Sequence, residues 1–134
     1  QIVSYVAVDD CGNVINHSIV EGQVHGGVTQ GAGQIFGEHA VYDRNSGQLL
    51  TGSFSDYYMP RAGLIREIQI GDHSVPSKSN VLGAKGVGES GCTASLPALA
   101  NAIMDALRPL GVPELDMPFT PSKVWHAIQA AQHK

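Results

Sequence analysis

The chain has 134 residues, of which 43% are hydrophobic and 15% are charged, so it is long and apolar enough to form one packed domain. Its formal net charge of −4 argues against a partner that is a nucleic acid or an anionic membrane surface. No apolar run is long enough to cross a bilayer. The two cysteines, Cys11 and Cys92, have no close spacing, which predicts free thiols rather than a disulfide framework or a zinc site. We therefore expect a single domain over residues 1–134, located in the cytoplasm.

The chain opens with a β-prone run, residues 2–8, which is followed by the turn residues 9–13 and by Val14 and Ile15. This order predicts a hairpin near residues 2–17. The first strand starts with no lead-in, as though the sequence had been cut from a longer one. We expect that this strand has lost a neighbour, and that its open edge either pairs with another copy or leaves the N-terminus frayed.

A glycine-rich helix is predicted near residues 20–41. Its apolar side chains recur at helical spacing, at Val20, Val24, Val28 and Ile35. Six glycines fall in the same stretch, and each interior glycine costs a helix about 0.5–1 kcal/mol relative to alanine. Either close packing or the approach of a ligand to the backbone explains them. Gln30 lies between Thr29 and Gly31, and its amide suits a neutral heterocycle or an oxo group, whereas the alternative is a solvent-facing helix residue.

The remaining elements complete an α+β fold, a small mixed sheet with packed helices. Alternating side chains predict a strand near residues 64–71. A helix is expected near residues 92–108, with one apolar face formed by Leu96, Leu99, Ile103 and Leu107. A last helix is expected near residues 121–131, because Thr120 and Pro121 have the pattern of an N-cap followed by proline at the first helical position.

The stretch that carries chemistry is the glycine loop, Gly83-Ala84-Lys85-Gly86-Val87-Gly88-Glu89-Ser90-Gly91. Four glycines surround one acid just before a helix N-terminus, where amide N–H groups and the helix dipole favour an anion. A carboxylate in this position stays ionised, as a general base requires. One interpretation is therefore a buried catalytic carboxylate that the backbone holds against a cofactor.

Other interpretations of the glycine loop compete with this one. A phosphate-binding loop needs its lysine directly after the last glycine, but Lys85 precedes Gly86. Residues 86–91 match the dinucleotide pattern GxGxxG literally, but no buried strand precedes them and no βαβ unit surrounds them. A glycine-rich connector with a solvated glutamate is the simplest alternative.

Several motifs in order resemble one known family. They are Val6-Ala7-Val8-Asp9-Asp10-Cys11-Gly12, Glu21-Gly22-Gln23-Val24-His25-Gly26-Gly27, Gln30-Gly31-Ala32-Gly33-Gln34, Asp56-Tyr57-Tyr58-Met59-Pro60, the glycine loop and Met117-Pro118-Phe119-Thr120-Pro121. Together they resemble the C-terminal part of molybdenum hydroxylase large subunits, the family of xanthine dehydrogenase, aldehyde oxidase and aerobic carbon monoxide dehydrogenase. The likeness covers nearly the whole chain and is strongest to the bacterial carbon-monoxide-dehydrogenase-like and aldehyde-type members.

The resemblance implies roles for individual residues. Glu89 matches the family's catalytic base. Gly86, Val87 and Gly88 match the loop that lies against the molybdenum site and the pterin, and Gln30 matches a glutamine that lines the cofactor. Lys85 also fits the pattern, where its charge balances its neighbours. The implied cofactor is molybdopterin cytosine dinucleotide with molybdenum, and no residue of this chain is implied as a metal ligand.

The resemblance also implies partners. The family's large subunit is several times longer than this chain, and iron–sulfur clusters and FAD lie in other subunits or domains. We therefore expect an excised C-terminal segment that contributes part of the cofactor pocket, acts on a small-molecule substrate only within the full enzyme, and assembles with the rest of the large subunit, an iron–sulfur subunit and an FAD subunit. The alternative is a non-catalytic scaffold or cofactor-insertion relative that keeps only the fold, and metal analysis of the full-length protein separates the two.

Overall fold

The computed structural model describes residues 1–133, and it confirms the α+β class with three α-helices and one two-stranded sheet. The contacts divide the chain into two compact units. The first unit comprises residues 1–31 and 61–95, and the second comprises residues 32–60 and the chain after residue 95. The first unit holds the sheet and the glycine loop, so it is the unit that matters most for function.

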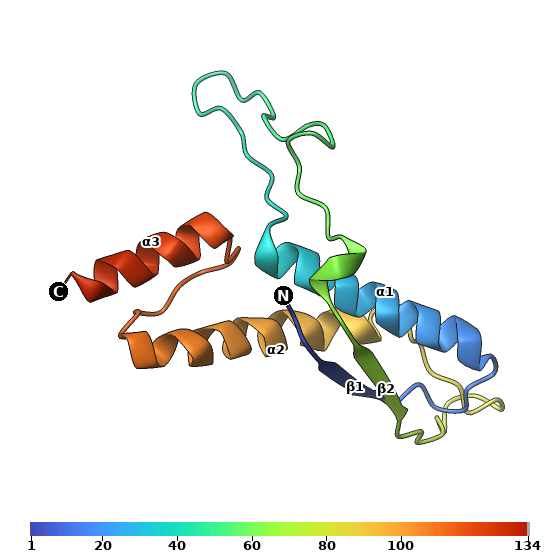
Figure 1. Cartoon of the computed structure of the whole chain (residues 1–134). Helices are drawn as coiled ribbons and strands as arrows, with labels where there is room; N and C mark the ends of the chain where they lie inside the picture. The colour runs from blue at the N-terminus through green and yellow to red at the C-terminus, as the bar shows by residue number, and fades with distance from the viewer. Residues whose placement is uncertain (134) are drawn as a thin grey trace. The chain divides into compact units, whose positions relative to one another are not determined.

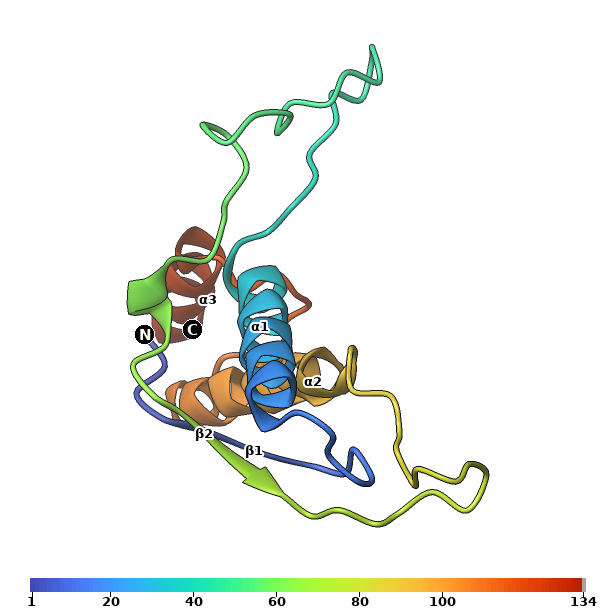
Figure 2. The same ribbon diagram turned by 90° about the vertical axis from the view of Figure 1, so that its right-hand side faces the viewer.

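The sheet pairs two strands that are far apart in the sequence. Strand β1 (Tyr5–Asp9) lies beside β2 (Ile68–Asp72) in parallel, from the pair Tyr5–Ile68 to the pair Asp9–Asp72 (Figure 1 and Figure 2). The predicted hairpin is therefore wrong. After β1 the chain turns at Gly12, which has a φ of +62°, and Asn16 then accepts a hydrogen bond from the Ile19 N–H at 3.1 Å. The next helix starts at His17, so too few residues remain for a returning strand.

The other edge of β1 has no partner strand among the described residues, as the sequence predicts. Ile2 is bridged to Ile65 and is only 9% exposed, so the start of the chain is tied to the β2 side rather than frayed. Val6 and Val8, on the outer face of β1, are each 63% exposed. The strand therefore has one bonded edge and one open edge.

Helix α1 (His17–Phe36) confirms the predicted glycine-rich helix, and buries Val24, Val28, Ala32 and Ile35. Glycines within this helix and directly after it allow close packing in each of the two units. In the first unit, Gly27 packs against the backbone of Gly91 and Cys92, and a β-carbon there would lie 2.7 Å from the Cys92 nitrogen. In the second unit, Gly33 and Gly37 pack against Pro60 and Tyr58. By contrast, Gly22 and Gly26 face open space, so packing does not explain them.

Helices α2 (Ser90–Leu107) and α3 (Pro121–Gln132) also lie where the sequence predicts them. On α2, Leu99 and Leu107 are buried and Leu96 and Ile103 are half-buried, which confirms the expected apolar face. The Thr120 side chain accepts a hydrogen bond from the Lys123 N–H at 3.3 Å, which confirms the predicted N-cap of α3. Short 3₁₀ helices, η1 (Ala62–Leu64) and η2 (Arg108–Leu110), precede β2 and follow α2.

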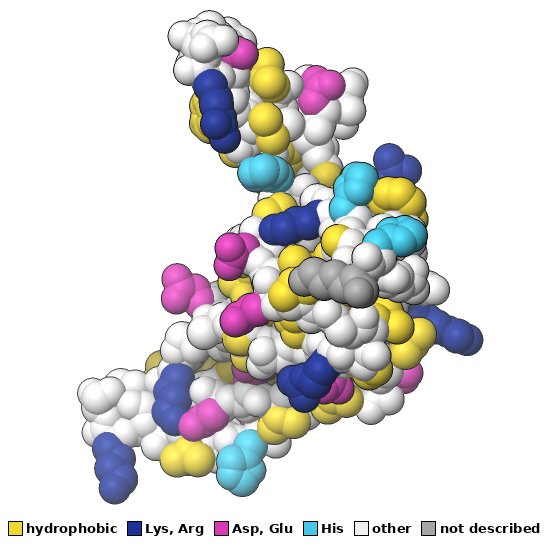
Figure 3. All heavy atoms as spheres, turned by 90° about the vertical axis from the view of Figure 1, so that its left-hand side faces the viewer, with side chains coloured by type: hydrophobic (Ala, Val, Ile, Leu, Met, Phe, Trp, Pro, Cys, Tyr) yellow, Lys and Arg dark blue, Asp and Glu magenta, His cyan; other side chains and the backbone are white. Residues whose placement is uncertain are grey.

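Charge is distributed without a strong bias on the visible surface. Lys and Arg side chains on the face in Figure 3 are scattered among acidic and hydrophobic ones and do not gather into one patch. Within residues 1–133, no helix combines the length and hydrophobicity that a membrane crossing requires. The face in Figure 3 therefore shows no basic stripe of the kind that nucleic-acid binding uses.

Candidate functional site

The four glycines of the glycine loop have different reasons to be glycine. Gly83 has a φ of +65°, a conformation that side chains rarely adopt. Gly91 packs against α1, and a β-carbon there would lie 2.4 Å from the Val24 carbonyl oxygen. Gly86 and Gly88 have neither a positive φ nor any neighbour within 4 Å of an added β-carbon. Nothing within the described part of the chain requires glycine at these two positions.

The residues of the loop alternate between two pockets. Gly86, Gly88 and Glu89 line an open pocket of about 600 Å³. Its other lining residues are Asp9, Asp10, Ser90 and Thr93. Lys85 and Val87 line a second pocket, of about 270 Å³, together with Ile15, Ile19 and other residues before and at the start of α1. Of the predicted cofactor residues, the structure therefore brings the two open glycines together with Glu89 and directs the other two loop residues elsewhere.

Glu89 occupies the position just before α2. Its backbone carbonyl accepts hydrogen bonds from the Thr93 N–H at 3.0 Å and from the Thr93 hydroxyl at 3.0 Å. Its side chain is exposed, not buried as the catalytic interpretation expects, because it borders the open pocket. Within residues 1–133, the Glu89 carboxylate has neither a hydrogen-bond donor nor a cation as partner, so both of its oxygens are free to accept a proton.

The backbone N–H groups of residues 86–89 are also without acceptors. None of these four N–H groups donates a hydrogen bond to another described residue, whereas the N–H groups on either side of them do. Lys85 N–H donates to the Cys11 carbonyl at 2.9 Å, and Ser90 N–H donates to the Val87 carbonyl at 3.2 Å. The loop therefore presents four free donors and one free carboxylate along the same short segment.

Lys85 is engaged by another acid. Its ammonium lies 2.5 Å from the Asp10 Oδ2, and both side chains are about one-third exposed, at 34% and 36%. The bond from Lys85, followed by backbone N–H bonds from Val75 and Gly12, lowers the pKa of Asp10 to about 2. The family resemblance implies a cofactor role for Lys85 and implies no role for Asp10.

The structure keeps Gln30 apart from the glycine loop's open pocket. Gln30 is exposed on α1 and does not line that pocket, nor does the structure show a hydrogen bond from its side chain. It is separated along α1 from the residues that do pack under the loop, Val24, Gly27 and Val28. Its predicted role toward a cofactor stays a prediction.

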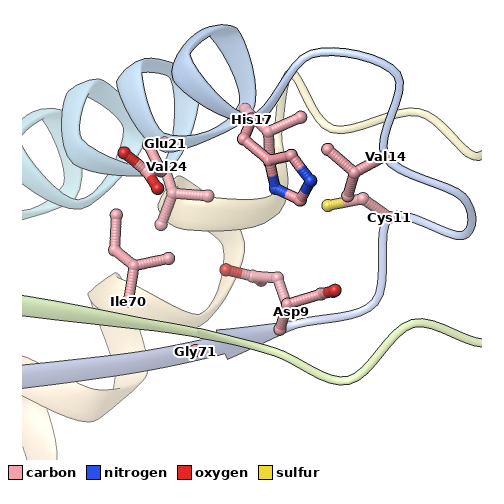
Figure 4. Close-up of a pocket in the computed structure, with 10 residues that line it drawn as sticks. Asp9, Cys11, Val14, His17, Glu21, Val24, Ile70 and Gly71 are labelled. Carbon is pink, nitrogen blue, oxygen red and sulfur yellow. The ribbon is translucent and has the colours of Figure 1, made fainter.

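A smaller pocket, of about 80 Å³, lies between the start of α1 and the ends of the two strands (Figure 4). Cys11 and His17 lie at one end of it, and Val24 and Ile70 lie at the other. Asp9 lines both this pocket and the open one, and its Oδ2 is buried with no hydrogen-bond partner in the described chain. Burial, and next the charge of Asp9, raises the pKa of the Cys11 thiol, which therefore stays protonated and unreactive.

No group of three or more histidine, cysteine or acidic side chains among residues 1–133 is placed to hold a metal ion directly. Both cysteines are free, as the sequence predicts, although only Cys11 is fully buried.

Comparison with known proteins places this arrangement in a family. The model of the molybdopterin cofactor-binding domain matches residues 1–66. The chain is 40% identical over 126 residues to the carbon monoxide dehydrogenase large chain of Hydrogenophaga pseudoflava, covering 93% of this chain and 15% of that one. It is 44% identical to the nicotine 6-hydroxylase large subunit of Paenarthrobacter nicotinovorans, covering 92% and 15%.

The fold gives the same result. The carbon monoxide dehydrogenase structure from Oligotropha carboxidovorans matches with a TM-score of 0.88 and 35% identity, over 96% of this chain and 16% of that one. The chain belongs to the molybdenum hydroxylase large-subunit family. It spans only about 15% of the length of the curated relatives that it matches.

The site residues fit a molybdopterin cofactor of that family in three respects. Gly86 and Gly88 leave the backbone open to close approach, although no described residue lies near enough to require glycine there. The four free N–H groups of residues 86–89 suit oxygen acceptors such as oxo, carbonyl or phosphate groups. The orphaned Asp9 Oδ2 suits an N–H donor, which a pterin or a cytosine provides.

Proposed function

We propose that this chain is part of a molybdenum-dependent oxidoreductase, in which it contributes the catalytic base and one wall of the cofactor pocket. The observation that carries the proposal is the unpaired Glu89 carboxylate at an open pocket, beside two glycines that face empty space and four unused N–H donors. A connector loop has no need of this combination. The family relationship supports the type of chemistry, and the geometry of the loop supports the choice of residues.

The cofactor in this proposal is molybdopterin cytosine dinucleotide, which supplies two-electron redox chemistry at its metal when it is bound. Gly86 and Gly88 let the backbone approach it closely, and the N–H groups of residues 86–89 hold its oxygen atoms. Gln30 and Lys85 extend the contact if other parts of the enzyme bring the cofactor to them. Val87 anchors the loop on its other side, because its side chain is half-buried against the start of α1.

Glu89 acts as the general base in this proposal. Its carboxylate takes the proton from the hydroxyl group that attacks an electron-poor carbon of the substrate, and it can do so at once because no other described group competes for its oxygens. The open pocket leaves room for both substrate and cofactor on the same side of the loop.

The partners follow from the same proposal. The rest of the large subunit completes the cofactor pocket, while an iron–sulfur subunit and an FAD subunit carry the electrons away. The substrate is a small molecule. The matched relatives are named for carbon monoxide and for nicotine at similar identity.

The test is Glu89→Gln in the assembled enzyme, with turnover normalised to molybdenum content. Glutamine keeps the shape of the side chain and removes its charge, so the fold and the metal content should change little. A general base contributes about 10²–10⁴-fold, and we expect a loss at or above the top of that range. Normalised activity within tenfold of wild type would contradict the base assignment, and the glycine loop would then be a cofactor clamp with Glu89 as a solvated bystander.

A further inference from the structure

The glycine loop is fixed at one end to the turn that follows β1. Lys85 N–H donates to the Cys11 carbonyl at 2.9 Å, and Asn13 N–H donates to the Gly83 carbonyl at 3.0 Å. The Asn13 side chain donates to the Leu82 carbonyl at 2.9 Å. These bonds join residues 11–13 to residues 82–85 but end there, so the backbone of residues 86–89 has no such support.

Asp10 extends this attachment through side chains. Its Oδ1 accepts hydrogen bonds from the Gly12 N–H at 3.0 Å and from the Val75 N–H at 3.0 Å, and its Oδ2 accepts one from Lys85. One carboxylate therefore joins its own turn, the segment after β2 and the glycine loop. The donors hold the carboxylate in one orientation, so the position of the Lys85 ammonium is also defined.

The same contact affects Glu89. Lys85 and Glu89 are only four residues apart, and Glu89 lies within the turn that the Ser90 N–H closes on the Val87 carbonyl. A Lys85 ammonium freed from Asp10 would be the cation nearest to Glu89 along the chain. An ion pair with Lys85 would stabilise the ionised form of Glu89 and weaken it as a base. Asp10 holds the Lys85 ammonium instead, and Glu89 keeps no cationic partner in the described chain.

We propose that Asp10 is a positioning residue for Glu89, which it serves by pairing with Lys85, so that Lys85 does not pair with the base, and by fixing the glycine loop to the turn after β1. This inference rests on the proposed role of Glu89 as the base. It assigns Lys85 a function within the protein, as the partner of Asp10, rather than a contact with the cofactor alone. In this inference Asp10 acts through Lys85 and through the loop.

The charged groups around Glu89 allow a specific test. Asp9 and Asp10 line the same open pocket as Glu89, Lys85 pairs with Asp10, and Cys11 lines the two other pockets. The pKa of Asp10 is about 2 because Lys85 and two N–H groups favour its ionised form, so Asp10 does not titrate in the pH range of turnover. The Cys11 pKa is raised by burial, so the thiol stays neutral there. A shift in the acidic limb of the pH–rate profile therefore reports on Glu89 and its neighbours.

The experiment compares Asp10→Asn, Lys85→Met and the double variant in the assembled enzyme, with kcat/KM followed against pH. Asp10→Asn frees Lys85, so we expect the acidic limb to move down by a few tenths of a unit to about one unit, the range that an exposed charge pair produces. Turnover should also fall by on the order of ten- to hundredfold, because a catalytic group displaced by about 1 Å loses up to that much. The double variant has no free cation, and its acidic limb should return to the wild-type position.

A merely structural role for Asp10 gives a different pattern. In that case Asp10→Asn lowers turnover with an unshifted limb, or the double variant keeps the shift, and either result overturns the inference. Asp105→Asn is the matched control, because Asp105 pairs with Arg108 at 3.4 Å on α2 with both side chains more than three-quarters exposed. It should leave both the limb and the turnover unchanged.

A second measurement covers the case in which Asp10→Asn does not assemble. Lys85→Met removes the same contact and leaves Asp10 its bonds to Gly12 and Val75. Amide exchange of Lys85 and Asn13 in the apoenzyme should then become faster, by about tenfold, because their bonds to Cys11 and Gly83 lose the adjacent side-chain link. Unchanged exchange at both amides overturns the inference. Glu89→Gln tests the proposed function separately, so loss of activity there with no effect of Asp10→Asn refutes only the positioning role.

Discussion

Two glycines of the same loop, Gly91 and Gly88, should respond in opposite ways to alanine. A β-carbon on Gly91 would lie 2.4 Å from the Val24 carbonyl oxygen and 3.0 Å from both the Val24 Cα and the Val28 nitrogen. All three atoms belong to the backbone of α1, so none can rotate away as a side chain does. Overpacking of this kind costs about 1–3 kcal/mol. Better helix propensity returns about 1 kcal/mol or less, since Gly91 lies inside α2.

Gly88→Ala meets no such obstacle. Nothing lies within 4 Å of the new β-carbon, and Gly88 does not have a positive φ. Replacing glycine where alanine fits without strain stabilises a protein by about 0.4–1 kcal/mol, through the lower entropy of the unfolded chain. By the packing of this chain alone, Gly88→Ala is therefore neutral or stabilising. The proposed cofactor pocket predicts a cost that appears only when the cofactor is bound.

The assay follows amide exchange in α1 and α2 of the apoenzyme together with molybdenum per protein in the loaded enzyme. Gly91→Ala should speed exchange at the start of α2 and in the middle of α1. Gly88→Ala should leave exchange unchanged or slower and still reduce molybdenum content, because the added methyl occupies the space along the loop. Wild-type molybdenum content and turnover in Gly88→Ala would refute the reasoning that Gly88 is kept for a bound group.

Two further predictions concern the helix cap and the cofactor. Thr120→Ala removes the side-chain bond to the Lys123 N–H and should destabilise the start of α3 by about 1 kcal/mol, which faster amide exchange in the first turn of α3 would report and an unchanged rate would contradict. The chain by itself should bind molybdopterin cytosine dinucleotide weakly or not at all, because a pocket built from several loops loses contacts and pre-organisation when only some are present. Titration with purified cofactor checks this, and sub-micromolar binding would count against a pocket shared with other segments.

The sequence predicts most of the helices because their signals are local. Thr120 and Pro121 mark the start of α3, and the N–H that donates to the Thr120 side chain belongs to Lys123, only three residues away. The apolar face of α2 repeats within one helix, and burial of Leu99 and Leu107 confirms it. The start of α1 was misplaced by three residues because Asn16 provides its cap earlier than the apolar pattern begins.

The strand pairing could not be predicted in the same way. β1 and β2 are separated by about sixty residues, and alternation in each strand says nothing about which strand it joins. The turn at residues 9–13 has the composition of a hairpin, and only the early start of α1 excludes a returning strand. Parallel pairing also needs a long connection, which α1 and the residues after it supply.

The sequence signals for the candidate site lie in the glycine loop. The glycine loop marks Glu89, Gly86 and Gly88 from sequence alone, and the structure places all three at one open pocket. Asp10 was missed because its partner Lys85 lies 75 residues away. The sequence shows two adjacent acids at the end of β1 and one cation in the glycine loop. It gives no reason to pair one of these acids with that cation.

The pairing of Lys85 with Asp10 changes the electrostatics of the site in a definite direction. If Lys85 were free, the loop would carry a cation four residues before its carboxylate, and an anionic ligand and the base would both compete for it. Asp10 neutralises that cation. The groups left to attract a ligand's oxygen atoms are therefore the unpaired N–H groups of residues 86–89, which carry only partial charges. The partial charges of N–H groups can hold a ligand's oxygen atoms without the full positive charge that would form an ion pair with a nearby carboxylate. A binding surface and a base can therefore share one short loop, provided that its lysine is held by an acid from elsewhere in the fold.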